Sequence, residues 1–143
     1  MASDDWREIP GYEGLYWITY TGKIKNAKGH IMSERFVTGT TNSGMGYMMV
    51  RLRLNGKTRN ENVHRLVARA FIGPPPSSEH VVDHIDGNTL NNSVDNLRWV
   101  TRSENRRWVE GRRDKQIAEL EEENKRLKRK IEKLEKKLEG VVK

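Results

Sequence analysis

The stretch Val82-Asp83-His84-Ile85-Asp86-Gly87-Asn88 decides the fold of the central part of this chain. Its apolar start predicts a strand, and Asp86-Gly87-Asn88 predicts the turn that follows. After an Asn-rich loop, Leu97-Arg98-Trp99-Val100 predicts the returning strand. Thr101-Arg102-Ser103-Glu104 then fits a capping box, so a helix is expected to begin at about Arg102. The sequence therefore predicts a strand–loop–strand–helix unit.

Four polar side chains of this unit stand at positions where they can meet. Asp83 and His84 end the first strand, Asn96 lies in the loop, and Asn105 lies one turn into the helix. Together they offer a carboxylate and an amide oxygen to a hard divalent cation, beside an imidazole that can take a proton from water. A single Asp-His pair is more often structural than catalytic. The combination of all four positions with their expected elements is what favours a catalytic site.

The segment before this unit predicts a helix. Residues 63–71 carry apolar side chains at helical spacing, and the run stops before Gly73-Pro74-Pro75-Pro76, which cannot continue a helix. His64, at the start of this helix, is expected to be a packing histidine with its hydrogen bonds satisfied. Asn91 and Asn92 are expected to cap backbone groups in the loop.

The N-terminal part, from Trp6 to Val63, reads as short strands separated by glycines. Asn55-Gly56 suits a two-residue turn between the strands 47–54 and 57–63, because both residues tolerate positive φ angles. Apolar and basic residues alternate along the first of these strands. One face of the hairpin is therefore expected to pack, and the other to be cationic through Arg51, Arg53, Lys57 and Arg59.

From Lys115 onward the sequence has the heptad pattern of a coiled coil. Ile and Leu dominate the a and d positions, with one Asn at a, which favours a parallel dimer. Glu123 would face Lys128 of the partner helix, and Lys130 would face Glu135. Gly111 is the expected joint before this helix, although a lone glycine permits continuity. The predicted dimerisation residues are Ile117, Leu120, Asn124, Leu127, Ile131, Leu134 and Leu138, with Val141 as the last d position.

Composition limits the class of protein. The 143 residues contain no cysteine, which excludes disulfides and Cys-ligated zinc. The start, MASDDWREIP, has no signal-peptide pattern, and no apolar run approaches a membrane span, so a cytoplasmic protein without a membrane partner is expected. Residues 1–113 hold 17 basic and 12 acidic side chains, so most of the net charge of +7 lies outside the heptads. A basic globular face suggests nucleic acid.

These motifs resemble the HNH endonucleases, specifically the phage and intron-homing branch. The resemblance rests on the central unit already quoted, on residues 63–72, and on residues 6–16, which look like the modular motif often attached to that nuclease. It implies a ββα-metal nuclease unit. Together with the N-terminal antiparallel β region and the C-terminal parallel coiled coil predicted above from the strand and heptad patterns, the expected fold class is α+β. The expected domains are 1–62 for DNA binding, 63–113 for the nuclease and 114–143 for dimerisation. Homing members often end in a helix-turn-helix module, whereas this chain has heptads there.

The resemblance also implies roles for residues. His84 would be the general base, Asp83 and Asn105 would hold one Mg²⁺ or Mn²⁺, and Asn96 would hold the loop and orient His84. The substrate would be double-stranded DNA, cut to 5′-phosphate and 3′-hydroxyl ends in a phage- or bacterium-like cell. The candidate DNA contacts are the four hairpin cations together with Arg98, Arg102, Arg106 and Arg107.

Two other functions remain open from the sequence. The basic stretch 106–113 runs into the heptads as in basic-zipper DNA readers, but Trp108 and Gly111 interrupt it and residues 1–100 would have no purpose. A catalytically inactive HNH-like module that only binds DNA as a dimer has the same sequence features. Activity alone separates that module from an enzyme.

Overall fold

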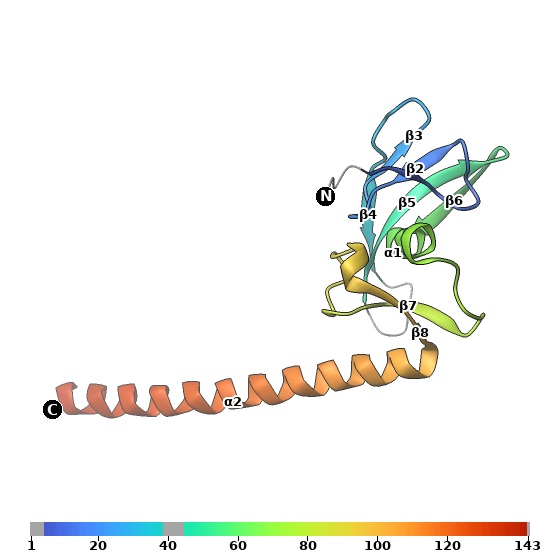
Figure 1. Cartoon of the computed structure of the whole chain (residues 1–143). Helices are drawn as coiled ribbons and strands as arrows, with labels where there is room; N and C mark the ends of the chain where they lie inside the picture. The colour runs from blue at the N-terminus through green and yellow to red at the C-terminus, as the bar shows by residue number, and fades with distance from the viewer. Residues whose placement is uncertain (1–4, 39–44, 143) are drawn as a thin grey trace. The chain divides into compact units, whose positions relative to one another are not determined.

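A computed structural model describes residues 5–38 and 45–142 of this chain. The chain divides into two compact units, Met1–Asn105 and Arg106–Lys143. The described strands of the first unit form three small antiparallel sheets, in the orders β1-β2-β3, β4-β5-β6 and β7-β8 (Figure 1). In chain order the elements are β1 (Arg7–Glu8), β2 (Tyr16–Ile18), β3 (Ile24–Asn26), β4 (Glu34–Val37), β5 (Tyr47–Leu54), β6 (Lys57–Asn62), α1 (Val63–Val67), η1 (Ala68–Ile72), β7 (His80–His84), η2 (Val94–Asn96), β8 (Leu97–Thr101) and α2 (Arg102–Val142).

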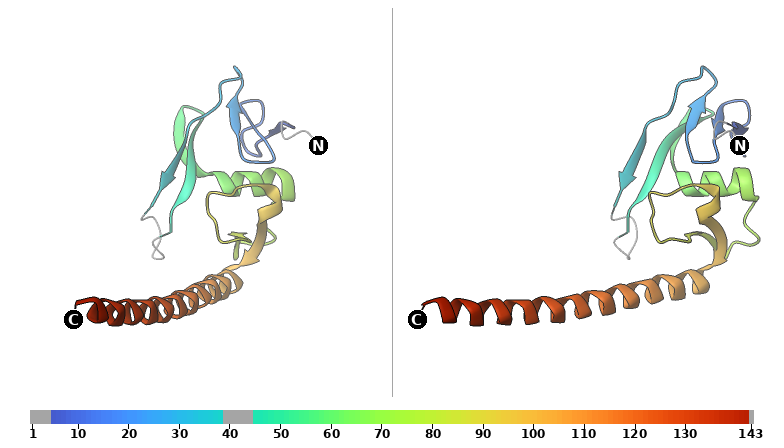
Figure 2. Two further views of the ribbon diagram at one scale, coloured as in Figure 1. Left: turned by 90° about the vertical axis from the view of Figure 1, so that its left-hand side faces the viewer. Right: turned by 60° about the vertical axis from the view of Figure 1, so that its left-hand side comes forward.

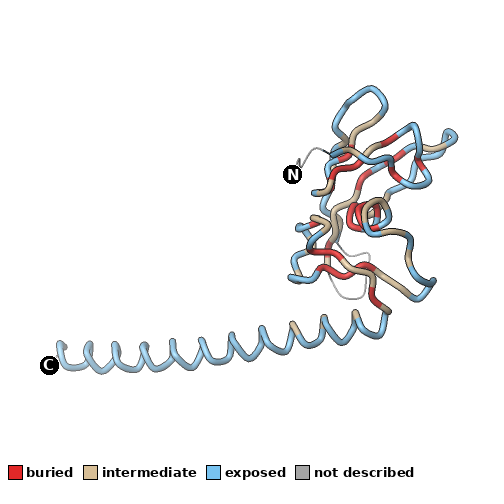
Figure 3. Tube along the Cα trace, in the orientation of Figure 1, coloured by how far each residue is buried: buried red, intermediate tan, exposed pale blue. Residues whose placement is uncertain are grey.

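Helix α1 lies at the centre of the first unit. With its π-helical continuation η1, it runs between the N-terminal sheets and the β7–β8 pair in both views of Figure 2. Figure 3 shows buried chain in α1 and in the strands around it. One hydrophobic core joins all three sheets to α1, and its members include Ile18, Ile24, Val50, Leu52, Val63, Leu66, Val67, Val82 and Leu97. The predicted helix is confirmed, and it ends at Ile72. The next residue, Gly73, has a φ of 123° and precedes the prolines.

The β5–β6 hairpin turns at Asn55-Gly56 as predicted, with φ values of 51° and 77°. The pairing of the two strands shows that the expectation of one face with all four cations is wrong. Arg51 pairs with Asn60, whereas Arg59 pairs with the buried Leu52 and Lys57 pairs with Leu54; all three cations are exposed. Directly opposed residues of an antiparallel pair project on the same side. Arg59 and Lys57 therefore lie on the same face of the hairpin as Leu52 and Leu54, where both cations remain exposed, and Arg51 and Arg53 lie on the other face.

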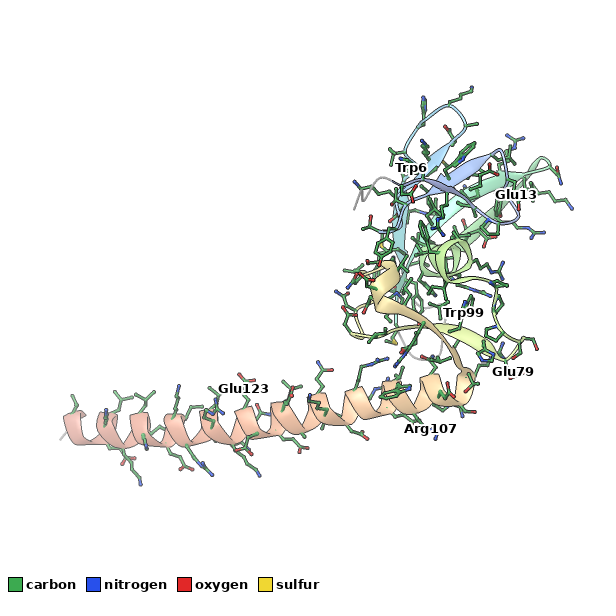
Figure 4. All side chains as sticks on the ribbon, viewed as in Figure 1. Trp6, Glu13, Glu79, Trp99, Arg107 and Glu123 are labelled. Atoms are coloured by element: carbon green, nitrogen blue, oxygen red, sulfur yellow. The ribbon has the colours of Figure 1, made fainter. Side chains whose placement is uncertain are left out.

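The predicted capping box is present at the start of α2. The Glu104 backbone N–H donates to Thr101 Oγ1, and the Thr101 N–H donates to a Glu104 carboxylate oxygen, both at 3.2 Å. The helix then continues through Gly111 without a break, so the expected joint is not an interruption. Side chains project from every side of α2, Glu123 and Arg107 among them (Figure 4). The described helices include none that is long and apolar enough to cross a membrane.

The N-terminal β region holds the loop between β7 and β8. The backbone N–H of Val94 donates to the carbonyl of Tyr20 at 3.1 Å, and the Tyr20 hydroxyl donates to Asp95. Gly22 approaches α1 closely: a Cβ added there would lie 3.0 Å from Val63 Cγ1. The first sheet and the β7–β8 loop are therefore parts of one packed body.

We expect Gly22→Ala to destabilise the protein by ~1–3 kcal/mol more than Gly29→Ala, because only the first overpacks the contact with α1. Both glycines have positive φ, 96° and 83°, so both substitutions carry the same kind of backbone strain. A Cβ at Gly29 meets nothing within 4 Å. Urea unfolding of the two variants measures the difference. Equal losses of unfolding free energy would contradict the close packing at Gly22.

Candidate functional site

The β7–β8 pair places Asp83 and His84 side by side at the end of β7. Asp83 lies opposite Arg98 and His84 opposite Leu97, and the two polar side chains are only 2% and 5% exposed. Both Nε and Nη2 of Arg98 lie 3.0 Å from Oδ2 of Asp83. The guanidinium therefore balances the charge of a buried carboxylate, which would otherwise be costly.

The imidazole of His84 is held by Asn92. Its Nε2 lies 2.8 Å from the amide oxygen of Asn92, and both side chains are buried. Because an amide oxygen only accepts hydrogen bonds, Nε2 carries the hydrogen and Nδ1 keeps a lone pair. An Nδ1 with a lone pair can accept a proton. The sequence assigned Asn92 to backbone capping, and its side chain is instead the partner of His84.

Asn96, expected to hold the loop and orient His84, makes its described bonds within the loop. Its amide N–H donates to Asp86 Oδ1 and to the Asn91 carbonyl, both at 2.9 Å, and its oxygen accepts the Asp86 N–H at 2.9 Å. The N–H of Asn88 lowers the pKa of Asp86, which keeps that carboxylate available as an acceptor. Asn96 thus braces the chain that leaves His84, and the bond to the ring comes from Asn92.

Asn105, in the first turn of α2, lines a cleft of about 430 Å³. The cleft draws side chains from β5, α1, β7 and the start of α2. Its lining contains two arginines, Arg65 and Arg102, and no acidic residue among those described. The full lining is Tyr47, Met49, Asn62, His64, Arg65, Ser78, His80, Val81, Val82, Arg102 and Asn105.

Three aromatic rings gather beside the cleft. The centroids of Tyr47 and His64 are 4.9 Å apart, those of His64 and His84 are 5.0 Å apart, and Tyr47 stacks on His84 at 6.1 Å. Burial, followed by the nearby His84 and Arg65, lowers the pKa of His64 to about 3, so this ring is neutral. From its place in the sequence, His64 is expected to have its hydrogen bonds satisfied. Its Nδ1 is instead buried without a hydrogen-bond partner among the described residues.

The remaining predicted cations differ in their surroundings. Arg98 is half-buried and bonded to Asp83, whereas Arg102, Arg106 and Arg107 are exposed on α2. The predicted coiled-coil residues lie on the second unit, where the apolar ones from Ile117 to Leu138 are 47% to 63% exposed in the single chain. The sequence pattern located these residues on the correct elements, but the cross-strand contact of Arg98 needed the sheet register.

Two family models match this arrangement. An HNH endonuclease model matches residues 61–107, and the NUMOD4 motif matches residues 4–53. The first range contains α1, β7, β8 and the polar residues described above, and the second contains the first sheet and much of β5.

Similar proteins are phage and prophage endonucleases. DNA endonuclease I-HmuI of Bacillus phage SP01 is 38% identical over 102 residues, which cover 71% of this chain and 55% of that protein. The SPbeta prophage-derived putative HNH homing endonuclease YosQ of Bacillus subtilis (strain 168) is 44% identical over 94 residues, covering 65% and 51%. The chain spans about half, or less, of the length of the curated relatives it matches.

A solved structure supports the fold. The structure titled "DNA binding and cleavage by the HNH homing endonuclease I-HmuI" is similar with a TM-score of 0.62 and 36% identity, covering 80% of this chain and 66% of that chain. The mixed α and β architecture with a long C-terminal helix is therefore confirmed. Residues 61–107 of this chain form an HNH endonuclease domain. The chain carries a NUMOD4 motif before its HNH domain, and its relatives include phage and homing endonucleases, which confirms the resemblance seen in the sequence.

The buried His64 makes stability depend on pH. Below its usual pKa of 6.5 the unfolded chain binds a proton at His64, which the folded chain does not bind until about pH 3. The free energy of unfolding therefore has its full contribution from neutral His64 above pH 6.5. This contribution declines as the pH falls from 6.5 toward 3, by up to about 1.4 kcal/mol per pH unit.

We expect His64→Phe to reduce this dependence of the unfolding free energy on pH, measured by urea unfolding at about pH 7, 5.5 and 4.5. The exposed His30→Ala should keep the wild-type slope. Identical slopes for wild type and His64→Phe would contradict the burial of a neutral ring.

Proposed function

We propose that this protein is a metal-dependent DNA endonuclease that hydrolyses phosphodiester bonds to 5′-phosphate and 3′-hydroxyl ends. The observation that carries the proposal is the buried His84 ring, bonded at 2.8 Å to Asn92 within a domain that matches the HNH endonucleases. A relative with 38% identity is itself named a DNA endonuclease. We assign residues 1–62 to DNA binding, 63–113 to the nuclease and 114–143 to dimerisation.

His84 is the general base in this proposal. With its hydrogen on Nε2 shared with Asn92, its Nδ1 takes a proton from the attacking water. Stacking on Tyr47 and the contact with His64 restrict rotation of the ring. Asn96 acts one step further away, because it fixes the loop that follows His84.

Asp83 and Asn105 would hold the divalent ion, Mg²⁺ or Mn²⁺. A carboxylate and an amide oxygen are the donors that such hard cations accept. The described residues contain no cluster of three His, Asp or Glu side chains suited to a metal, which agrees with an ion that keeps water and phosphate as its other ligands. When bound, the ion would neutralise the attacked phosphate and stabilise the departing 3′-oxygen. Arg98 holds the Asp83 carboxylate in place.

The DNA surface in this proposal has two parts. Arg51 and Arg53 project from the β5–β6 hairpin on the side away from the core, and Arg102, Arg106 and Arg107 are exposed on α2. Exposed guanidinium groups bind phosphates without reading sequence. Lys57 and Arg59 would contact DNA at the edge of the hairpin. Arg98 would contribute mainly through Asp83.

His84→Ala should abolish cleavage while the fold and DNA affinity remain. Loss of a general base costs ~10²-fold or more in rate. Supercoiled plasmid incubated with Mg²⁺ gives nicked and linear products, and EDTA in place of Mg²⁺ should stop the wild type without unfolding it. His30→Ala, an exposed histidine, is the matched control and should cleave normally. Cleavage by His84→Ala within tenfold of wild type, or full activity in EDTA, would contradict the mechanism.

A parallel homodimer through α2 is the second part of the proposal. The heptad residues form an apolar row on an otherwise charged helix, and Ile117, Leu120 and Leu127 are about half exposed in the single chain. A second copy would cover this row, with Glu123 facing Lys128. Two nuclease units related by a two-fold axis would each cut one strand of an inverted-repeat site.

We expect the intact chain to sediment as a dimer at micromolar concentration and to linearise plasmid. Leu127→Lys with Leu134→Lys places two charges in the row and should give a monomer that mainly nicks. Ala118→Lys with Glu122→Lys places two lysines outside the row and should leave the dimer intact. A monomeric wild type would contradict the assembly. Truncation after Gly111 should also give a nicking monomer, and concerted linearisation by that chain would contradict the link between assembly and double-strand cutting.

A further inference from the structure

His64 is a polar residue in an apolar position. It is the second residue of α1, its side chain is 6% exposed, and its helix neighbours Val63, Leu66 and Val67 belong to the core. Its Nδ1 has neither solvent contact nor a hydrogen-bond partner among the described residues. Leaving a buried polar atom unpaired lowers the stability of the fold. A phenylalanine would make the same ring contacts with Tyr47 without this loss, so packing alone does not account for a histidine here.

The unpaired nitrogen indicates where the ring hydrogen lies. A neutral imidazole carries one N–H, and a buried N–H without an acceptor is costly. The tautomer with a lone pair on the sealed Nδ1 and the hydrogen on Nε2 avoids an unpaired N–H. His64 also lines the cleft. The ring therefore offers an N–H donor on the side opposite its sealed nitrogen.

The cleft suits an anion. Arg65 and Arg102 line it together with Asn62 and Asn105, and no described acidic side chain takes part in the lining. Its volume of about 430 Å³ accommodates a phosphate with adjoining sugar. The centroid of His64 lies 5.0 Å from that of His84. A phosphate attacked by the water that His84 activates would thus lie within reach of His64.

We propose that His64 is a second catalytic histidine, whose neutral imidazole donates Nε2–H to a non-bridging oxygen of the scissile phosphate. The inference rests on the proposed nuclease function. His64 transfers no proton: its N–H stabilises the negative charge that grows on the phosphate oxygens as water attacks. The two histidines have different roles, since His84 accepts a proton and His64 only donates a hydrogen bond. The cost in stability is then explained by catalysis, as is common for strained or unpaired groups at active sites.

The test compares three substitutions at this position. His64→Phe keeps the ring and removes both nitrogens, His64→Gln places an amide N–H near the position of Nε2, and His64→Asn places one near Nδ1. We expect His64→Phe to unfold at the same or a higher temperature than wild type, yet to cleave DNA ~10²-fold more slowly in single turnover with Mg²⁺. His64→Gln should recover most of that loss and His64→Asn should not. DNA affinity measured in EDTA should change little.

Cleavage of a phosphorothioate substrate gives a second measurement, which a purely structural role of His64 would not affect. Once the cleavage position is mapped on plasmid, a duplex with sulfur at one non-bridging position of that phosphate removes the acceptor that His64 contacts. For one of the two stereoisomers, the rate ratio of wild type to His64→Phe should shrink toward one.

The outcomes separate this inference from the proposed function. Wild-type rates for His64→Phe, or rate losses that follow the loss of thermal stability in all three variants, would overturn the role of His64 while leaving His84 in place. A wild-type protein that cleaves no DNA would instead overturn the proposed function, and the role of His64 with it.

Discussion

The packing of α1 against three small sheets is the constraint on which the rest of the structure depends. A two-stranded pair such as β7–β8 is at best marginally stable on its own. Val63, Leu66 and Val67 contribute to a core that also contains Ile18 and Leu52 from different sheets. Without this shared core, the apolar side chains of the β7–β8 pair would have little to pack against. Strand β7, which carries Asp83 and His84, is therefore stabilised by residues of both matched motifs, which pack as one body although they are separate segments of sequence.

The same helix shapes the chemistry of the site. Because α1 follows directly after β6, its second residue is brought next to Tyr47 of β5 and His84 of β7. Burial in this position keeps His64 neutral, with its pKa lowered to about 3. Asp83 is also buried, but Arg98 of the facing strand compensates its charge. The site thus combines a paired carboxylate, Asp83, with the imidazole of His64, whose Nδ1 has no hydrogen-bond partner in the described part of the chain.

The C-terminal helix contrasts with this body. Its apolar row lacks the surrounding strands that cover α1, and its residues remain about half exposed in the single chain. Relatives of this chain extend well beyond the matched region, since it spans about half of their length or less. A helix with heptads provides a surface for a second copy in our proposal. The HNH domain and the row of heptads would then serve cutting and assembly through separate parts of the chain.

The sequence by itself determined the elements whose signals are local. The Asn55-Gly56 hairpin, the capping box at Thr101 and the end of the helix before Gly73 depend on backbone preferences within a few residues, and all three were predicted. The residue types of the Asp83-His84 motif also predicted the HNH domain, which the match over residues 61–107 confirms. The sequence could also have predicted which face of the hairpin carries Arg59, because a two-residue turn sets the pairing of the two strands. The alternation of apolar and basic residues along β5 alone does not show that pairing.

Only the tertiary structure decided which groups complete the site. Asn92 and Asn96 are both loop asparagines, and nothing local distinguishes the one that reaches His84 from the one that braces Asp86. Among the described residues the Nδ1 of His64 has no hydrogen-bond partner, because Tyr47 of β5 and His84 of β7, which are distant in sequence, pack against the ring. Hydrogen-bond partners and burial are set by how elements pack, since the free energy of a polar side chain depends on all of its neighbours and not on its own segment.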